Sequence, residues 1–276
     1  MFRDIEVKYN DPEEGIVQVI LNRSSKLNAF RMETFEEMRE LFLNVFPRRL
    51  SEIKVVVISS ASDKFFTSGL DLSCPSVQSI LVPSETPSVG QQANYLRQTI
   101  RSLQEPFIAI SEFRRPVICC ISGVCYGLGI DLACACDIRI LSHSASLSVR
   151  EVKIGICADL GTLFFLPRMC GNDSWVREVC FTGRVFGAQE AASNGFSSAP
   201  VGNAHSRGIE IARSIACEES LAVEGTKENL NKSTRGQMRK ALDYVALWNS
   251  IKLQDTETIQ RAMAKLMASK PSLSRL

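Results

Sequence analysis

The sequence predicts an α/β protein with a helical C-terminal region, and three observations carry this prediction. Short apolar runs typical of buried strands alternate with segments of helical periodicity. Glycine-rich turns follow two of these runs, as at strand-to-helix junctions. From about residue 196 onward the chain becomes polar and helical.

The chain opens with a predicted hairpin. Residues 5–9 alternate between apolar and polar side chains, residues 10–12 supply a turn, and residues 16–21 form a second strand-like run. Apolar residues at helical spacing then predict a helix over 35–45, which Pro47 would close. The N-terminal part therefore predicts two paired strands followed by a helix.

The next part predicts two buried strands separated by a loop and a long helix. Residues 54–60 and 117–121 are continuous apolar runs, which are typical of parallel strands covered on both faces. Residues 93–113 have helical periodicity, and Arg115-Pro116 ends that pattern. Serines and three prolines over residues 73–90 predict a surface loop or lid.

The remaining elements are shorter and then mainly helical. Residues 123–129 predict a glycine-rich turn that leads into a helix at 130–137. Two further short strands are predicted at 138–141 and 146–149. The polar C-terminal part predicts helices over 204–216, 233–248 and 255–268.

The composition is that of an ordinary globular protein. Of the 276 residues, 45% are hydrophobic and 22% are charged. A formal net charge of +2 is too small for non-specific electrostatic binding of a nucleic-acid backbone. Apolar runs stay shorter than the ~20 residues that span a bilayer, and the first residues do not resemble a secretory signal. We therefore expect a protein that binds neither nucleic acid nor a membrane.

The histidines and cysteines limit the possible chemistry. Two histidines, His143 and His205, argue against a His-rich metal centre and against a Ser-His-Asp site. The ten cysteines form no C-x-x-C pair and lie in apolar contexts, which predicts buried, reduced thiols. Catalysis would therefore depend on carboxylates, backbone donors, Lys or Cys, without a metal.

Two glycine-containing segments are candidates for an oxyanion site. Residues 66–72 (Phe-Thr-Ser-Gly-Leu-Asp-Leu) and 123–131 each follow a predicted strand. A tight glycine turn can leave a backbone N–H unpaired, and the first turn of a helix favours negative charge. Two such turns could place two N–H groups around one oxyanion, as stabilisation of an enolate requires. Ordinary tight turns are the alternative interpretation.

Three acidic residues lie in apolar or glycine-bearing surroundings. Asp131, Glu151 and Asp159 are separated by twenty and eight residues. Burial raises the pKa of such carboxyls, which suits proton transfer near neutral pH. The alternative for each is a helix cap or a partner of a neighbouring Arg. Asp137, beside Ile138-Arg139, is assigned to that structural class.

The chain resembles the enoyl-CoA hydratase/isomerase (crotonase) superfamily along nearly its whole length. Within it, the Asp131, Glu151 and Asp159 trio is similar to that of the Δ3,5-Δ2,4-dienoyl-CoA isomerases, as is the stretch 242–254. Hydratases have Glu at the first two positions and glycine at the third. The other motifs that carry the resemblance are residues 21–29, 66–72, 115–117, 123–131, 135–139, 155 and 161–167.

The resemblance implies a fold, a reaction and roles for the site residues. The fold would be an α/β spiral of ββα units over residues 1–200, with a helical region for oligomer packing over 201–276. The reaction would be isomerisation of 3,5-dienoyl-CoA to 2,4-dienoyl-CoA in unsaturated fatty-acid β-oxidation. The residues that would bind the substrate are Ser68, Gly69, Leu70, Asp71, Leu72 and Leu128.

The mechanism implied by the resemblance divides the work among backbone and acids. The N–H groups of Leu70 and Leu128 would hold the thioester oxygen. Glu151 would remove a proton near the thioester, and Asp159 would deliver one at the far end of the conjugated system. Asp131 would orient the polyene or tune its neighbours' pKa values. No metal or redox cofactor is implied, because coenzyme A is part of the substrate.

Two departures from the family pattern leave alternatives open. Leu128 stands where the family usually has glycine, and Ser24 stands where it has proline. The Leu128 side chain could crowd the thioester. The alternatives are therefore a 2-enoyl-CoA hydratase, a mono-ene isomerase or a non-catalytic acyl-CoA-binding member. Lys64 and Lys227 are candidates to meet the CoA phosphates.

The resemblance also implies partners and a location. Relatives form homotrimers, often paired as hexamers. Ser274-Arg275-Leu276 resembles a peroxisomal address of the Ser-Lys-Leu type, which an import receptor reads. We therefore expect a peroxisome or a related organelle such as a glycosome, with the mitochondrion as the alternative.

Overall fold

Five strands form the first of two sheets in the computed structural model, which describes residues 2–9, 14–81 and 88–268. In sheet order they are β1 (Ile5–Tyr9), β2 (Ile16–Leu21), β3 (Val55–Ser60), β5 (Val117–Ile121) and β7 (Ile138–Leu141). β1 and β2 pair antiparallel, and the other neighbours pair parallel. The predicted hairpin and the predicted strands of this sheet are confirmed.

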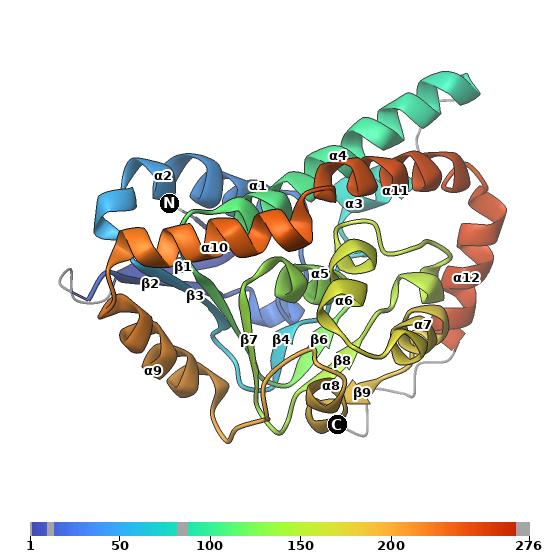
Figure 1. Cartoon of the computed structure of the whole chain (residues 1–276). Helices are drawn as coiled ribbons and strands as arrows, with labels where there is room; N and C mark the ends of the chain where they lie inside the picture. Colours follow the sequence, from blue (N-terminus) through green and yellow to red (C-terminus); the bar gives the residue numbers. More distant parts are fainter. Residues whose placement is uncertain (1, 10–13, 82–87, 269–276) are drawn as a thin grey trace.

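The first sheet is buried on both faces, which explains its continuous apolar runs. Val55 and Val57 of β3 and Ile118 of β5 pack against helix α9 (Ala204–Ala216) on one face. The residues between them, such as Val56 and Cys119, belong to the main core on the other face. Figure 1 shows α9 on one side of this sheet and α1 on the other. Successive side chains of a strand point to opposite faces, so a doubly covered strand needs apolar residues at every position.

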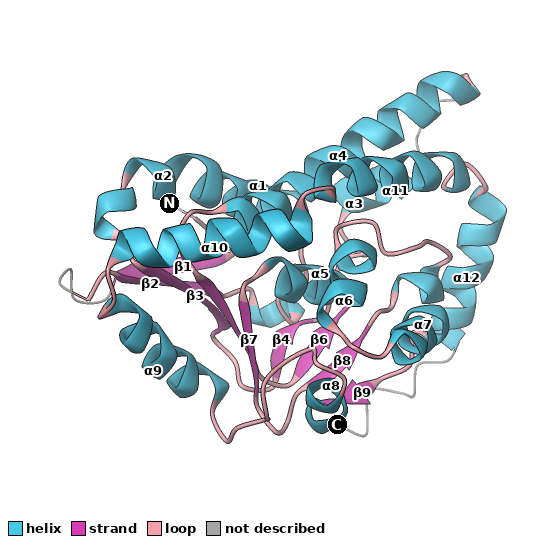
Figure 2. Cartoon of the chain, viewed as in Figure 1, coloured by secondary structure: helices cyan, strands magenta, loops and turns pink. Residues whose placement is uncertain are grey.

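The second sheet is smaller and lies next to the first (Figure 2). Its strands are β4 (Phe65–Thr67), β6 (Val124–Tyr126), β8 (Ser146–Ser148) and β9 (Phe186–Gly187). β4, β6 and β8 each directly follow a strand of the first sheet, namely β3, β5 and β7. The chain therefore repeats a strand–strand–helix unit. The glycine segment 123–129, interpreted as a turn, contains the short strand β6.

The first helical region continues past the predicted stop. Helix α1 (Met32–Glu40) runs into a π-helical turn (Leu41–Val45) and then into the short α2 (Phe46–Arg48). Pro47 lies in the first turn of α2, where the missing N–H has no helical partner in any case. The prediction that Pro47 closes the helix is therefore wrong by one residue.

The predicted loop at 73–90 is partly helical. Helix α3 (Pro75–Leu81) begins with a proline, and α4 (Val89–Glu112) begins four residues earlier than predicted. Ser88 caps α4 by accepting a hydrogen bond from the Gln91 backbone N–H. The loop prediction is wrong for these segments because serine and proline also favour the first turn of a helix. Residues 82–87 lie outside the described residues.

The helices after β6 form the rest of the molecule. They are α5 (Leu128–Ala135), α6 (Thr162–Met169), α7 (Asp173–Thr182), α8 (Ala188–Ser193), α9, α10 (Ser220–Arg235), α11 (Met238–Lys252) and α12 (Thr256–Ala268). α10 was not predicted, and the helix expected at 233–248 is divided at Gly236 and Gln237. α11 packs along α4 (Figure 1), and α12 packs on the 3-10 turn Glu151–Ile154.

The described part of the chain has no helix that is both long and apolar enough to cross a membrane. All ten cysteines are free thiols. Seven are buried as predicted, whereas Cys74 and Cys157 are half-buried and Cys217 is exposed.

Candidate active site

The two glycine turns that the sequence analysis singled out lie in contact. Gly69 has φ +100° and Gly127 has φ +56°, a region in which side chains are strained. A Cβ atom at Gly69 would lie 3.0 Å from the carbonyl oxygen of Tyr126, and one at Gly127 would lie 3.9 Å from the Gly69 Cα. Both the backbone conformation and the close approach therefore require glycine at these positions.

The turns carry two backbone donors that the protein does not use. Among the described residues, neither the Leu70 N–H nor the Leu128 N–H donates to a protein acceptor. Leu128 begins α5, so its N–H has no partner within the helix. The Leu70 turn is held by Phe30, whose N–H donates to the Gly69 oxygen and whose oxygen accepts from the Asp71 N–H, both at 2.8 Å. The fold thus presents two N–H groups on adjoining turns.

The side chain of Leu128 belongs to the main hydrophobic core. It is 3% exposed. The next residue could not bear a side chain, because a Cβ at Gly129 would lie 2.6 Å from the Thr67 methyl carbon. The departure from the family glycine at position 128 is therefore accommodated by packing, and the Leu128 N–H is retained.

Three carboxyl groups converge near these turns from three elements. Asp131 lies one turn into α5, Glu151 begins the 3-10 turn, and Asp159 precedes α6. Asp131 is fully buried, while Glu151 and Asp159 are each 9% exposed. A Cβ at Gly127 would lie 3.4 Å from Glu151 Oε1, so this acid adjoins the turn that carries the Leu128 N–H.

Burial raises the pKa of all three acids, and repulsion by neighbouring carboxylates adds to it for Asp131 and Glu151. Burial is the main cause, and it raises the pKa of Asp131 to about 7 and that of Asp159 to about 6. The pKa of Glu151 is raised well above its ordinary value by burial and by the charges of Asp131 and Asp159. Three carboxylates in one buried cluster repel one another, so the cluster retains at least one proton near neutral pH.

Two carboxyl oxygens in this cluster have no hydrogen-bond partner in the part of the chain that the structure describes. They are Glu151 Oε2 and Asp131 Oδ2, and both are buried. The other oxygen of Asp131 accepts a hydrogen bond from the Thr162 backbone N–H at 2.7 Å. Buried polar atoms are normally paired, so unpaired carboxyl oxygens are suited to exchange protons with a ligand.

Asp159 is held by two helices that the sequence analysis did not connect to the site. The Asn249 side chain on α11 donates from Nδ2 to Asp159 Oδ2 at 2.7 Å. The Gln104 side chain on α4 donates from Nε2 to the Asp159 backbone oxygen at 2.6 Å. Neither residue was predicted as a site residue. The sequence signal for each is a polar amide on an otherwise apolar helix face, which indicates a buried polar contact. The partner in that contact is known only once the helices are packed.

The remaining predicted substrate-binding residues have structural contacts. The carboxylate of Asp71 accepts hydrogen bonds from Arg23 Nη1 at 2.8 Å and from the Ser73 side chain at 2.6 Å. Although burial opposes it, these contacts lower the pKa of Asp71. The Ser68 N–H donates to the Leu27 oxygen, and Leu72 packs against the apolar cluster that links α4, α11 and α12. These residues shape the Gly69 turn.

Lys227 is held in an ion pair inside the protein. Its side chain is 8% exposed, and Nζ lies 2.6 Å from Asp137 Oδ2, which also accepts from the Val117 N–H. The suggestion that Lys227 meets the CoA phosphates is therefore wrong, because a buried ammonium already paired with a carboxylate is not available. The structural assignment of Asp137 is confirmed.

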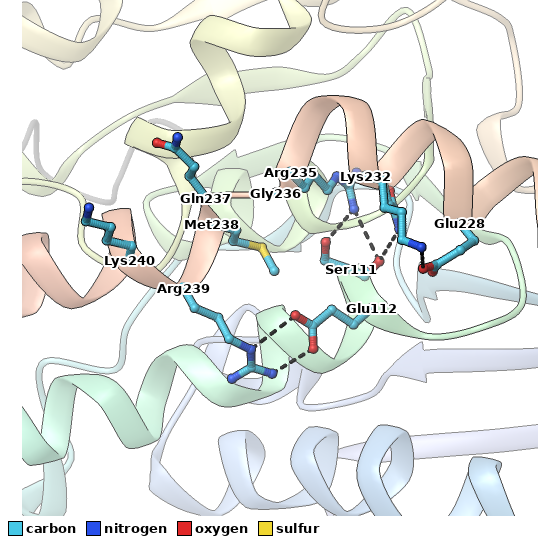
Figure 3. A pocket seen from close by; sticks show the side chains of 11 residues that line it. Ser111, Glu112, Glu228, Lys232, Arg235, Gly236, Gln237, Met238, Arg239 and Lys240 are labelled. Atoms are coloured by element: carbon cyan, nitrogen blue, oxygen red, sulfur yellow. Dashed lines mark hydrogen bonds and ion pairs between the residues drawn. The ribbon is translucent and has the colours of Figure 1, made fainter.

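A cavity of about 440 Å³ between the end of α4 and the α10–α11 junction does not include the acidic trio. Figure 3 shows several of its polar and charged side chains paired with one another. Arg239 bonds Glu112, Lys232 pairs with Glu228, and Arg235 donates to Ser111. Within the described ranges, no group of three or more His, Cys, Asp or Glu side chains could hold a metal ion.

Comparison with known proteins gives consistent matches along the chain. A family model described as enoyl-CoA hydratase/isomerase matches residues 11–268. The chain is 35% identical to the peroxisomal Δ(3,5)-Δ(2,4)-dienoyl-CoA isomerase of Arabidopsis thaliana, over 100% of this chain and 98% of that protein. It is 34% identical to the mitochondrial Δ(3,5)-Δ(2,4)-dienoyl-CoA isomerase of Rattus norvegicus, over 98% and 83%. It is 30% identical to carnitinyl-CoA dehydratase of Escherichia coli K12, over 84% and 82%.

Solved structures share the architecture. An enoyl-CoA hydratase from Bacillus halodurans superposes with a TM-score of 0.80 at 20% identity, covering 95% of this chain and 100% of that one. An enoyl-CoA hydratase/isomerase from Mycobacterium paratuberculosis gives a TM-score of 0.79 at 23% identity, covering 95% and 98%. At these identities the likeness concerns the fold.

Proposed function

The chain belongs to the enoyl-CoA hydratase/isomerase (crotonase) family, and from that premise we propose that it isomerises 3,5-dienoyl-CoA to 2,4-dienoyl-CoA in fatty-acid β-oxidation. The family and the fold predicted from the sequence are thereby confirmed. The observation that carries the proposed reaction is the buried cluster of three acids beside two unused backbone donors. Relatives named as dienoyl-CoA isomerases at 34–35% identity support it.

The proposed reaction moves two double bonds without any net change in atoms. The Leu70 and Leu128 N–H groups bind the thioester oxygen, so the protons on C2 become acidic. Glu151, which adjoins the Leu128 turn, takes a proton from C2 in its ionised form, and the electron pair forms an enolate conjugated with both C=C bonds, a trienolate. Protonated Asp159 then gives its proton to C6. The C3=C4 and C5=C6 bonds become C2=C3 and C4=C5.

The electrostatics of the cluster allow one carboxyl to be protonated while another is ionised. Because three neighbouring buried carboxyls repel, some are protonated while others are ionised near neutral pH. The cluster can therefore supply a base and an acid at the same time. Asp131, with the highest burial, would orient the polyene and raise its neighbours' pKa values. No metal or redox cofactor takes part in this scheme, since the backbone donors activate the thioester.

A second candidate is hydration of a 2-enoyl-CoA or a single double-bond shift. The observation that favours it is the 30% identity to a carnitinyl-CoA dehydratase. A hydratase holds one water between two acids, so it would depend little on Asp159. A non-catalytic acyl-CoA-binding protein is the remaining candidate, and it would bind thioesters without exchanging their protons.

The test is an ultraviolet assay with 3,5-octadienoyl-CoA that follows the 2,4-dienoyl chromophore. Wild-type protein should form the chromophore, and Asp159→Asn should abolish it. Hydration of crotonyl-CoA by an Asp159→Asn variant as fast as by the wild type would favour the hydratase. Tight acyl-CoA binding without turnover of either substrate would favour the non-catalytic protein.

We further propose that residues 1–200 hold the acyl-CoA site and that residues 201–276 pack between copies in a homotrimer or a hexamer. An apolar stripe on the outer face of α11 supports this. Tyr244, Leu247, Trp248 and Ile251 recur at helical spacing and are 42–65% exposed. Light scattering of the wild type and of a Trp248→Glu variant tests the assembly, which the charge should weaken.

The proposed location is the peroxisome, and the alternative is the mitochondrion. The Arabidopsis relative is peroxisomal and the rat relative is mitochondrial. The predicted address Ser274-Arg275-Leu276 lies outside the described residues. A fluorescent fusion with these three residues at its carboxyl end should enter peroxisomes, and one without them should not.

A further inference from the structure

An amide on helix α11 is built into the acidic cluster. Asn249 is 1% exposed, although it lies in a helix whose outer face is largely open to solvent. Its Nδ2 donates to Asp159 Oδ2 at 2.7 Å and to the Cys157 backbone oxygen at 3.0 Å. Its Oδ1 accepts from the Cys157 thiol at 3.0 Å. Both ends of the amide, Nδ2 and Oδ1, are therefore hydrogen-bonded to the segment 157–159.

The thiol determines which end of the amide meets the acid. A thiol can donate to Oδ1 only when Nδ2 is turned towards the carboxylate. A reversed amide would place an oxygen against Asp159 and lose both donated hydrogen bonds. Among the described residues, Asn249 makes the one side-chain hydrogen bond to the Asp159 carboxyl group. Its burial makes that contact stronger than an exposed one.

We propose that Asn249 is a positioning residue for proton delivery: its amide fixes the Asp159 side chain and selectively stabilises the carboxylate that forms when Asp159 gives up its proton. This inference rests on the proposed function. An amide N–H binds a carboxylate more strongly than a neutral carboxyl oxygen, so the contact tightens as the proton leaves. Asp159 is thus a stronger acid than its burial alone would make it. Asn249 itself does not touch the reacting carbons.

The groups around Asp159 show that the Asn249 contact is the one that stabilises its carboxylate. The titratable groups that face it are Asp131 on α5, Glu151 on the 3-10 turn and Cys157 on its own segment. α4 and α11 contribute the neutral amides of Gln104 and Asn249. No cation pairs with Asp159 among the described residues. Asn249 is therefore the side chain that favours its ionised form.

The experiment compares Asn249→Leu with Gln104→Leu in the full-length protein. Both variants remove a buried amide that donates to Asp159, but Gln104 reaches its backbone oxygen and Asn249 its carboxylate. In Asn249→Leu the pKa of Asp159, followed by ¹³C NMR of labelled aspartate, should rise by about one unit. In Gln104→Leu it should stay within a few tenths. The Asp159 signal is identified by its absence in Asp159→Asn.

Kinetics should separate positioning from binding. In Asn249→Leu, kcat should fall by about ten- to a hundredfold while KM changes little, since the lost contact is charge-assisted and does not reach the substrate. Cys157→Ala removes the group that orients the amide but leaves the donor, so it should cause a smaller loss. If Asn249→Leu does not fold, Asn249→Ser supplies the same comparison with Gln104→Leu.

Two outcomes would overturn the inference. One is an unchanged Asp159 pKa in a folded Asn249 variant. The other is an equal pKa rise in Gln104→Leu, which would assign the effect to general loosening of the segment. The NMR measurement needs no substrate, so it remains decisive even if the wild type fails to isomerise dienoyl-CoA and the proposed function falls.

Discussion

Two acidic sites in this molecule, the buried trio and the half-buried Asp137, differ in how their charges are satisfied. Asp137 lies against Lys227 at 2.6 Å and accepts a backbone hydrogen bond from Val117. The acidic trio has no paired cation within residues 2–9, 14–81 and 88–268, and two of its oxygens have no partner there. The first site joins α10 to the end of α5 and is complete without a ligand. The second is left incomplete by the fold, which is typical of a site that acts on something else.

This contrast shows that burial alone does not distinguish a structural acid from a chemical one. Each member of the trio has a raised pKa because it is buried, and like charges add to this for Asp131 and Glu151. Asp71, also buried, has a lowered pKa because Arg23 and Ser73 donate to it. The partners of a carboxylate, more than its depth, decide its role.

The largest effect should follow loss of the acid beside the oxyanion turn. Glu151→Gln is isosteric and should lower kcat for 3,5-octadienoyl-CoA by about 10²- to 10⁴-fold, because it removes the proton acceptor. The melting temperature should stay equal or rise, since a buried charge without a cation is lost. Activity within tenfold of wild type would contradict the role of Glu151.

Loss of a cation from the paired site should affect stability and leave chemistry intact. Lys227→Met leaves the half-buried Asp137 without its ammonium partner and should lower the free energy of unfolding by about 2–4 kcal/mol. Urea denaturation measures this. The double variant Lys227→Met/Asp137→Asn should recover part of the loss, and kcat per folded molecule should match wild type. A large kcat defect in the double variant would break the distinction between the two sites.

The raised pKa values of the trio should make the stability of the protein depend on pH. A carboxyl whose pKa is raised on folding retains its proton after the unfolded chain has lost it, so the folded state becomes less stable as pH rises from about 4 to 7. The Asp131 contribution amounts to about 1.4 kcal/mol per pKa unit. Urea titrations at pH 4.5 and 7.5 should therefore show a shallower decline for Asp131→Asn than for wild type. Parallel declines would argue against a raised pKa at Asp131.

The smallest predicted effect concerns the glycine turn. Gly127→Ala should cost about 1–2 kcal/mol of stability, because φ is +56° and the new Cβ would lie 3.4 Å from Glu151 Oε1. Gly90→Ala is the control. Gly90 lies in helix α4, and a Cβ added there would meet no atom within 4 Å, so alanine should be neutral or slightly stabilising. Equal changes in stability for the two substitutions would contradict the requirement for glycine at position 127.

Much of the architecture was predictable because it follows from local periodicity. The hairpin, the strands β3, β5, β7 and β8, and helices α9 and α12 lie where alternation or helical spacing placed them. The errors concern segments in which local signals conflict. Prolines and serines predict a loop over 73–90, where Pro75 and Ser88 begin helices, and helix α10 is too polar for its periodicity to predict it.

The order of amino acids is enough to define the kind of chemistry available: which residues are acidic, which turns require glycine, and which family the pattern resembles. How those groups are partnered depends on the packing of the folded chain. Asn249 lies 90 residues from Asp159, and Lys227 lies 90 residues from Asp137. Periodicity reports on neighbours along the chain, whereas a carboxyl's pKa depends on burial and on partners brought together by packing. The difference between a paired acid and an unpaired one is therefore a property of the folded molecule.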